Sequence, residues 1–358
     1  MQTGIIGLPQ TGKTTLFKIL TKAHLDMRAG QQTTHVGVAK VPEPRIDQLA
    51  ALYKPKKVTY ATVEYVDVGG IVREKGRESA ALTQLREVDA LAHVVRVFEN
   101  PSVPHPSGKV DPLGDVENLD LELMLADLDQ VLRRLERLEK DLKKKKDPVH
   151  EKEQAVLLRC KAALEAGQPL RELGFSAEEH KLLTGFMFLS QRPMLYVLNL
   201  GDEDASDLDQ AVEKHGLSKL IGRPNTVVVP ICGRIEAELA ELGDAEAAEL
   251  LGAYGLKSPG LDRVIQATYA LLGLTSFFTA GEPEVRAWTI HRGMSAAKAA
   301  GVIHSDIERG FIKAEVVRWD ELLECGGWAQ ARERALLRLE GKDYIVQEGD
   351  VILFRHSG

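Results

Sequence analysis

The sequence predicts an α/β fold in which a mostly parallel β-sheet is covered by helices, with a helical insertion and a smaller α+β domain at the C-terminal end. Three observations carry this prediction. Short β-branched runs alternate with helical patterns over much of the chain. A long leucine-rich segment separates two of these runs, and beyond residues 273–281 the chain turns into short, β-rich segments.

Six apolar runs have the composition of buried strands, and the first of them leads directly into a glycine loop. They cover residues 3–6, 36–41, 62–68, 91–98, 194–199 and 226–231. Helical patterns separate several of these runs, the first over residues 16–20. Strands that alternate with helices favour a parallel sheet with both faces covered.

Residues 99–193 separate the fourth and fifth strands, which is far more chain than a simple crossover needs. Leucines recur every three or four residues from Leu121 to Leu142, and this spacing predicts a coiled-coil-like seam. Lys143–Lys146 and Asp147-Pro148 end the first helix, and residues 149–166 form a second that runs back. The lysine run is either a solvated helix end or a contact for an anionic partner such as RNA.

The C-terminal part is expected to be a small α+β domain of roughly 80 residues. Its predicted strands are residues 285–290, 311–319, 344–347 and 351–355. Gly349-Asp350 has the composition of a turn between the last two.

Composition excludes several classes of protein. The 358 residues carry 46 Lys and Arg against 53 Asp and Glu, a net charge of −7, which disfavours a cationic nucleic-acid binder but permits a local basic patch. Apolar residues make up 44% and charged residues 28%, which excludes global disorder. The three isolated cysteines, without a CxxC or a Cys/His spacing, disfavour a disulfide scaffold and a structural zinc site. No apolar run reaches the ~18–20 residues that span a bilayer, and the N-terminus lacks a signal pattern, so we expect a cytoplasmic protein without membrane contact.

The segment from Gly7 to Thr14, GLPQTGKT, fits the phosphate-loop pattern GxxxxGK[ST] between a strand and a helix. Its glycines allow backbone N–H groups to turn toward a β-phosphate, and the helix N-terminus adds positive potential. Lys13 is expected to reach the β and γ phosphates, and the Thr14 hydroxyl to ligate Mg²⁺. The sequence therefore predicts a nucleoside-triphosphate site.

Asp67 and Gly70 belong to a second part of this site. They stand in the segment DVGG that ends the third strand. Asp67 is expected to hold the magnesium through water, and Gly70 to offer its N–H group to the γ-phosphate. Alone this pattern is usually a turn, but downstream of a phosphate loop it favours the functional interpretation.

The base site is expected at Asn199-Leu200-Gly201-Asp202, which resembles the NKxD motif of GTPases with Leu200 in place of Lys. Asp202 can accept the N1 and N2 hydrogens of guanine, and Asn199 can bond N7, which adenine shares. Cys232-Gly233-Arg234, after the sixth strand, stands where such folds place a further base-contacting loop.

Ile71 follows Gly70, at the position where many GTPases carry a glutamine that orients the attacking water. A hydrophobic side chain cannot do this, so another group positions the water or intrinsic turnover is slow. His105, in the proline-rich loop 101–112, is the nearest candidate, although a lone loop histidine is more often inert.

These motifs together make the chain similar to the YchF family, the Obg-like ATPases among the P-loop GTPases, nearly end to end. The stretches that carry the resemblance include GLPQTGKTTLF (7–17), HVVRVFEN (93–100), FFTAGEPEVRAWTI (277–290) and LEGKDYIVQEGDVILF (339–354). The resemblance implies a Ras-like nucleotide domain over residues 1–115 and 190–275, a helical coiled-coil arm over residues 116–189, and a β-grasp-like TGS domain over residues 278–358. It also implies Mg²⁺-dependent hydrolysis of ATP or GTP by a monomer. The implied partner is the ribosome, particularly its large subunit, or RNA, through the arm and the TGS domain.

When the family's roles are carried over residue by residue, the resemblance implies nucleotide contacts along the whole phosphate loop. The residues of the base site keep the roles predicted above. The residues concerned are Gln10, Thr11, Gly12, Lys13, Thr14, Thr15, Asp67, Gly70, Asn199, Leu200, Asp202, Cys232 and Gly233. It places His105 where members carry a loop histidine.

The chain departs from the family pattern in its switch segments and at the base site. The first switch, from Gln31, is shorter, and Thr33 or Thr34 is expected to meet the metal, with Thr34 preferred. Asp202 stands where most members carry glutamate. Family membership favours ATP and Asp202 favours guanine, so we expect ATP hydrolysis with relaxed specificity.

Two functions stay open. The first is a slow regulatory NTPase, supported by the intact phosphate loop and Asp67. The second is an RNA- or ribosome-binding adaptor that nucleotide stabilises with negligible turnover, supported by Ile71 and the shortened switches. A small-molecule phosphotransferase is disfavoured, since no second substrate pocket is readable.

Overall fold

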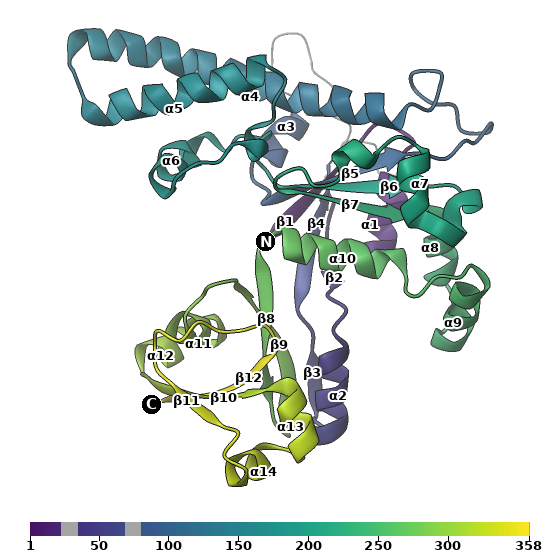
Figure 1. The fold of residues 1–358 in the computed structure, drawn as a ribbon, viewed down its shortest axis with the longest axis vertical. Helices are drawn as coiled ribbons and strands as arrows, with labels where there is room; N and C mark the ends of the chain where they lie inside the picture. The colour runs from purple at the N-terminus through teal and green to yellow at the C-terminus, as the bar shows by residue number, and fades with distance from the viewer. Residues whose placement is uncertain (23–34, 69–79, 358) are drawn as a thin grey trace. The chain divides into compact units, whose positions relative to one another are not determined.

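The computed structural model describes residues 1–22, 35–68 and 80–357. The chain divides into two compact units, Met1–Gly37 with Glu64–Ala267, and Val38–Val63 with Thr268–Gly358. Within these described ranges the structure contains two six-stranded sheets, whose strands are labelled in Figure 1. None of the described helices combines the length and the apolar character that a membrane crossing needs.

The first sheet has the strand order β2-β4-β1-β5-β6-β7. Its strands are β1 (Gln2–Ile6), β2 (His35–Lys40), β4 (Thr62–Asp67), β5 (Ala90–Arg96), β6 (Met194–Asn199) and β7 (Thr226–Ile231). The pairs β1–β4, β1–β5, β5–β6 and β6–β7 are parallel. Every residue of β5 and β6 is buried, as in strands covered on both faces. The predicted α/β fold with a mostly parallel sheet is confirmed.

Helices cover this sheet and leave one edge for loops. They are α1 (Lys13–Thr21), α3 (Ala80–Leu85), α7 (Leu208–Lys214), α8 (Gly233–Leu239), α9 (Asp244–Ala253), α10 (Gly260–Leu271) and the 3₁₀ turns η3 (Asp202–Asp207) and η4 (Ser218–Leu220). Apolar side chains of α3 and α7 share one buried cluster with the sheet, and α1 contacts α8. Because the carboxyl ends of parallel strands meet at one edge, the loops after β1, β4, β6 and β7 lie there together.

A helical hairpin is inserted between β5 and β6, in the region where the sequence predicts a coiled-coil arm. It consists of α4 (Pro112–Lys144) and α5 (Pro148–Glu165), followed by η1 (Leu170–Glu172), α6 (Ala177–Leu183) and η2 (Thr184–Phe186). Both long helices begin with proline after an aspartate whose side chain accepts a backbone N–H bond of the first turn, a strong start signal. Their shared apolar cluster is distinct from that of the sheet.

The prediction that the leucines from Leu121 to Leu142 form a packed seam is correct only in part. Leu138 is buried, and Leu128 and Leu135 pack at the edge of the arm's cluster. Leu121 and Leu132, however, are 45% and 41% exposed. Only one stripe of α4 faces α5, so a leucine at a neighbouring angle on the helix points to solvent.

The second unit contains a sheet of order β11-β10-β12-β8-β9-β3. Its strands are β3 (Lys57–Thr59), β8 (Leu274–Ala280), β9 (Glu284–His291), β10 (Phe311–Arg318), β11 (Arg338–Glu340) and β12 (Asp350–His356), and its helices are α2 (Pro44–Tyr53), α11 (Ala296–Ile303), α12 (Ser305–Arg309), α13 (Trp319–Cys325) and α14 (Trp328–Glu333). The β8–β9 hairpin is antiparallel, β12 runs parallel to β8, and α11 packs on the core. This arrangement is the expected β-grasp-like domain.

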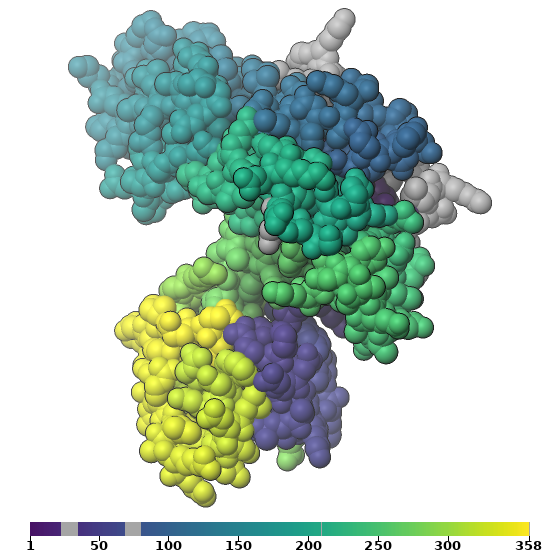
Figure 2. Space-filling model, turned by 45° about the vertical axis from the view of Figure 1, so that its right-hand side comes forward, coloured from purple at the N-terminus to yellow at the C-terminus, as the bar shows by residue number. Residues whose placement is uncertain are grey.

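Residues 38–63 belong to this second unit, whereas the predicted boundaries placed them in the nucleotide domain. β3 pairs in parallel with β9, and the Tyr53 hydroxyl accepts a bond from the Trp328 N–H at 3.2 Å. Arg45 forms an ion pair with Glu348. Figure 2 shows the purple residues of this segment against the yellow C-terminal residues.

The predicted strands of the second unit differ from the structure at two places. Leu274–Ala280 forms the interior strand β8, where the sequence analysis placed only a change of composition between Gly273 and Gly281 and no strand. Residues 344–347 form no strand and contribute only the isolated bridge between Ile345 and Ser295. The backbone of this segment makes only two bonds to the described residues around the start of α11, from Ala296 N–H to the Tyr344 carbonyl at 2.7 Å and from Val346 N–H to the Met294 carbonyl at 3.1 Å, which is too short a ladder for a strand.

Candidate nucleotide-binding site

The loop from Gly7 to Gly12 joins β1 to α1, and its backbone requires glycine at two places. Gly7 has φ +144° and Gly12 has φ +96°. A Cβ atom at Gly7 would lie 2.5 Å from the carbonyl oxygen of Val94, and one at Gly12 would lie 2.7 Å from Nδ2 of Asn199. Gln10 also adopts a left-handed conformation, with φ 62°. The result is a tight turn that ends at the N-terminus of α1, where Gly12 offers no capping side chain to the free N–H groups.

Lys13 lies inside this loop. Its Nζ atom donates to the carbonyl of Leu8 at 2.6 Å, and the hydroxyl of Thr11 donates to the same carbonyl at 3.1 Å. Burial lowers the pKa of Lys13, and the charge of Asp67 opposes that shift. A partly buried ammonium group at the start of a helix is suited to an anionic phosphate.

Thr14 and Asp67 meet at the same end of the sheet, where Oγ1 of Thr14 lies 3.3 Å from Oδ2 of Asp67. Burial raises the pKa of Asp67, and Lys13 opposes the rise. A hydroxyl and a carboxylate are the hard oxygen ligands that Mg²⁺ prefers, so these two residues fit the metal that the sequence predicts.

Asn199, at the end of β6, connects the phosphate loop to the loop after β7. Its Nδ2 atom donates to the Thr11 carbonyl at 3.0 Å, and its Oδ1 atom accepts from the Gly233 N–H at 2.9 Å. One amide side chain therefore holds the two loops that would contact the phosphates and the base.

Asp202 follows in η3 and is bonded to the loop after β7. Its Oδ1 atom accepts from the Cys232 thiol at 3.3 Å, and its Oδ2 atom accepts from Nη1 of Arg234 at 2.8 Å. Burial raises the pKa of Cys232 to about 11, so the thiol is a donor at neutral pH.

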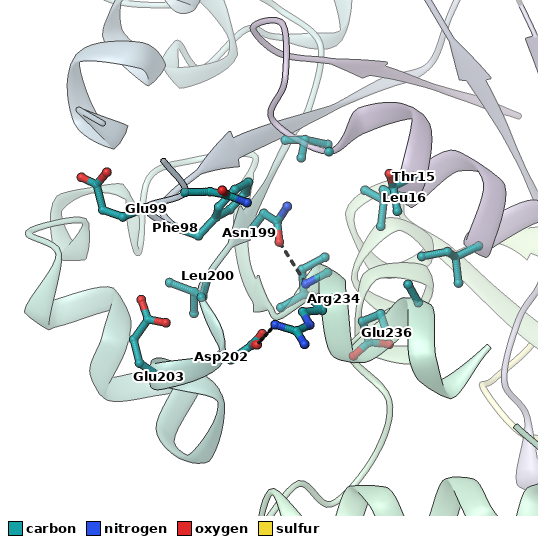
Figure 3. A pocket seen from close by; sticks show the side chains of 18 residues that line it. Thr15, Leu16, Phe98, Glu99, Asn199, Leu200, Asp202, Glu203, Arg234 and Glu236 are labelled. Atoms are coloured by element: carbon teal, nitrogen blue, oxygen red, sulfur yellow. Dashed lines mark hydrogen bonds and ion pairs between the residues drawn. The ribbon is translucent and has the colours of Figure 1, made fainter. Parts of the chain in front are cut away.

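These residues surround a cavity of about 450 Å³ (Figure 3). Its lining from the sequence prediction comprises Gly12, Thr15, Asn199, Leu200, Asp202 and Gly233. Phe98, Glu99 and Glu203 also line it, and Arg234 faces Asp202 across one wall. A cavity of this size beside a phosphate loop can enclose a purine base and its ribose.

His105 does not line this cavity. It is 8% exposed, and its Nε2 atom lies 3.0 Å from Oδ2 of Asp115, in the first turn of α4. Its Nδ1 atom lies 2.8 Å from Oγ of Ser107. Both ring nitrogens are thus engaged within the loop, and a role on a water molecule would require the histidine to leave Asp115.

Some predicted residues cannot be placed. Thr33, Thr34, Gly70 and Ile71 lie outside the described residues.

The sequence did not reveal that Arg234 pairs with Asp202 or that Asp115 pairs with His105. For Arg234 the sequence did hold one indication of a place at the site, because Arg234 directly follows Cys232 and Gly233, which were predicted to contact the nucleotide. The second pair consists of two residues whose contact depends on how the loop folds back onto α4.

A phosphate loop between β1 and α1 of a mostly parallel sheet, with a purine-sized cavity at the ends of β6 and β7, defines the class of P-loop nucleotide-binding proteins. Residues 2–150 match a family model described as 50S ribosome-binding GTPase. Residues 274–357 match the model YchF-GTPase_C, described as a protein of unknown function (DUF933). The chain belongs to the YchF family.

Full-length relatives support that assignment. The ribosome-binding ATPase YchF of Bacillus subtilis (strain 168) is 42% identical over 362 residues, which cover 99% of this chain and 98% of the relative. The protein of the same name from Escherichia coli O157:H7 is 43% identical over 361 residues, covering 98% of each. The solved structure of the Schizosaccharomyces pombe YchF GTPase superimposes with a TM-score of 0.85 at 28% identity, covering 99% of this chain and 97% of that one.

Proposed function

We propose that this chain is a Mg²⁺-dependent P-loop NTPase that hydrolyses ATP or GTP to the diphosphate and phosphate. One observation carries the proposal. Lys13, Thr14 and Asp67 gather at the mouth of the phosphate loop, and the adjoining cavity is lined by Asn199 and Asp202.

Each residue has a distinct task in this proposal. Lys13 exchanges its bond to Leu8 for the β and γ phosphates, while the N–H groups of residues 10–15 bind the β-phosphate. Thr14 and Asp67 hold Mg²⁺, with Thr34 as a further metal ligand, and Gly70 contacts the γ-phosphate. When bound, Mg²⁺ neutralises charge that develops on the phosphates.

The base is held between the loops after β6 and β7. Asn199 bonds N7, Leu200 and Gly233 pack beside the ring, and Asp202, supported by Cys232, faces its pairing edge. His105, once released from Asp115, orients the attacking water. The requirement for that release supports slow intrinsic turnover.

The ribosome is the partner that the relatives' names support, since they are called ribosome-binding ATPases. We assign the contact to the helical arm and the TGS-like domain of a cytoplasmic monomer, on the large subunit or its RNA. Lys143–Lys146 are all exposed at the tip of the arm, and Lys143 also forms an exposed ion pair with Glu139 at 2.6 Å.

The adaptor function stays the second candidate, because the bonds of His105 to Asp115 and Ser107 leave it away from the cavity. Steady-state hydrolysis of ATP and GTP, with and without ribosomes, separates the two. Lys13→Ala should lower turnover or affinity at least tenfold, since the phosphate charge loses its cation. Lys18→Ala, a matched charge loss on the same helix, should change neither. Turnover that is undetectable even with ribosomes would favour the adaptor, and a Lys13→Ala variant that behaves like wild type would contradict the phosphate-loop assignment.

A further inference from the structure

The groups expected to read a purine base are bonded to one another. Asp202 uses both carboxylate oxygens, one for the Cys232 thiol at 3.3 Å and one for Arg234 at 2.8 Å. Figure 3 shows the Asp202 and Arg234 side chains pointing toward each other at the wall of the cavity. The pairing edge of the site is therefore closed in this conformation.

Guanine and adenine make different demands on that edge. Guanine presents two donors, N1–H and N2–H₂, one for each oxygen of a carboxylate. Each oxygen has two lone pairs, so Oδ1 can accept a guanine N–H beside the Cys232 thiol, whereas at Oδ2 the guanine N–H competes with the charged guanidinium of Arg234. Adenine has no donor at these two positions, and its N1 atom carries a lone pair that a bare carboxylate would repel. When adenine binds, Asp202 can keep its ion pair with Arg234, which neutralises the carboxylate charge.

The two bonds to Asp202 differ in how easily a bound ligand can break them. Cys232 is 2% exposed and its S–H group points at Oδ1 from the start of α8, so this contact is fixed by the fold. Arg234 is 74% exposed and Asp202 37% exposed, so their ion pair is a surface pair that a ligand can open. Nε of Arg234 also lies 3.5 Å from Oε1 of Glu238, which offers the displaced guanidinium another partner.

We propose that Arg234 is the residue that sets the base preference of this site: it occupies the Asp202 oxygen that guanine needs and shields adenine from the carboxylate charge. This inference rests on the proposed function, because it requires that the cavity bind a nucleotide. It predicts that this chain, with aspartate at this position, can bind an adenine nucleotide.

Calorimetric titration of GDP and ADP, each with Mg²⁺, tests the proposal on the full chain. The quantity compared is the ratio of the two dissociation constants. Arg234→Ala should move that ratio toward GDP by about two- to fivefold, the range that an exposed ion pair supports. The wild-type ratio should move the same way as salt rises, because salt screens exposed pairs.

Two further variants make the result specific. Arg137→Ala removes an exposed arginine from the distant part of α4 and should leave the ratio unchanged. In an Asp202→Asn background, Arg234→Ala should no longer shift the ratio, since the charge that it pairs with is gone. An unchanged ratio in Arg234→Ala, or an equal loss for both nucleotides, overturns this inference and leaves the proposed function standing. A wild-type protein that binds neither nucleotide overturns both.

Discussion

Asn199→Ala would cut the connection between the phosphate loop and the base loop. The side chain is 9% exposed and makes two bonds, to the Thr11 carbonyl at 3.0 Å and from the Gly233 N–H at 2.9 Å. Each bond contributes about 0.5–1.5 kcal/mol net, so the first unit should lose about 1–3 kcal/mol of unfolding free energy. Nucleotide affinity should fall at least tenfold, because both the N7 contact and the position of the loop are lost.

Urea unfolding followed by far-UV circular dichroism measures the first effect, and calorimetric titration measures the second. Tryptophan fluorescence supplies an internal reference, because Trp288, Trp319 and Trp328, the three tryptophans of the chain, all lie in the second unit. Asn199→Asp keeps the acceptor for Gly233 but puts a carboxylate oxygen against the Thr11 carbonyl, so it should reduce affinity further than alanine does. Stability within about 0.5 kcal/mol of wild type together with unchanged affinity would refute the reasoning.

Three other outcomes are expected. His105→Ala should lower kcat tenfold or more and leave nucleotide affinity within about twofold, because positioning a water acts on turnover rather than on ground-state binding; lost affinity instead would mean that the loop packs on the nucleotide. Burial lowers the pKa of His93 from 6.5 to about 4, so the unfolded chain binds more protons and the first unit should lose stability as pH falls from 6.5 toward 4. His93→Phe should flatten that pH dependence in urea unfolding, and an unaltered slope would assign it to other groups. Replacing all four residues of Lys143–Lys146 with glutamine should weaken ribosome co-sedimentation and its salt dependence without changing hydrolysis; unchanged binding would point to the TGS-like domain.

The phosphate loop could be predicted because Gly7, Gly12, Lys13 and Thr14 are close in sequence, and one strand–turn–helix geometry follows from them. Asp67 could be added because the ends of parallel strands share an edge, and it indeed contacts Thr14. The predicted roles of these residues in hydrolysis stay predictions.

Contacts that depend on where a side chain points could not be predicted from the sequence. Asp202 begins η3 and Arg234 lies in the first turn of α8, and nothing in their spacing along the chain shows that they pair. His105 was visible as a loop histidine, but not its burial against Asp115. Residues 38–63 were misassigned for a related reason, since the three residues of β3 gain their place only by pairing with β9, more than half the chain away.

The segment Val38–Val63 makes the C-terminal unit discontinuous in sequence, and this governs how the protein can be cut into parts. A polypeptide that stops at residue 267 would still carry α2, with Ile46 and Leu49 fully buried here, but without the β8, β9 and α13 that α2 contacts. A fragment that starts at residue 268 would lose β3 and leave the edge of β9 open, which invites aggregation. The piece expected to fold alone is residues 38–63 joined by a short linker to residues 268–358.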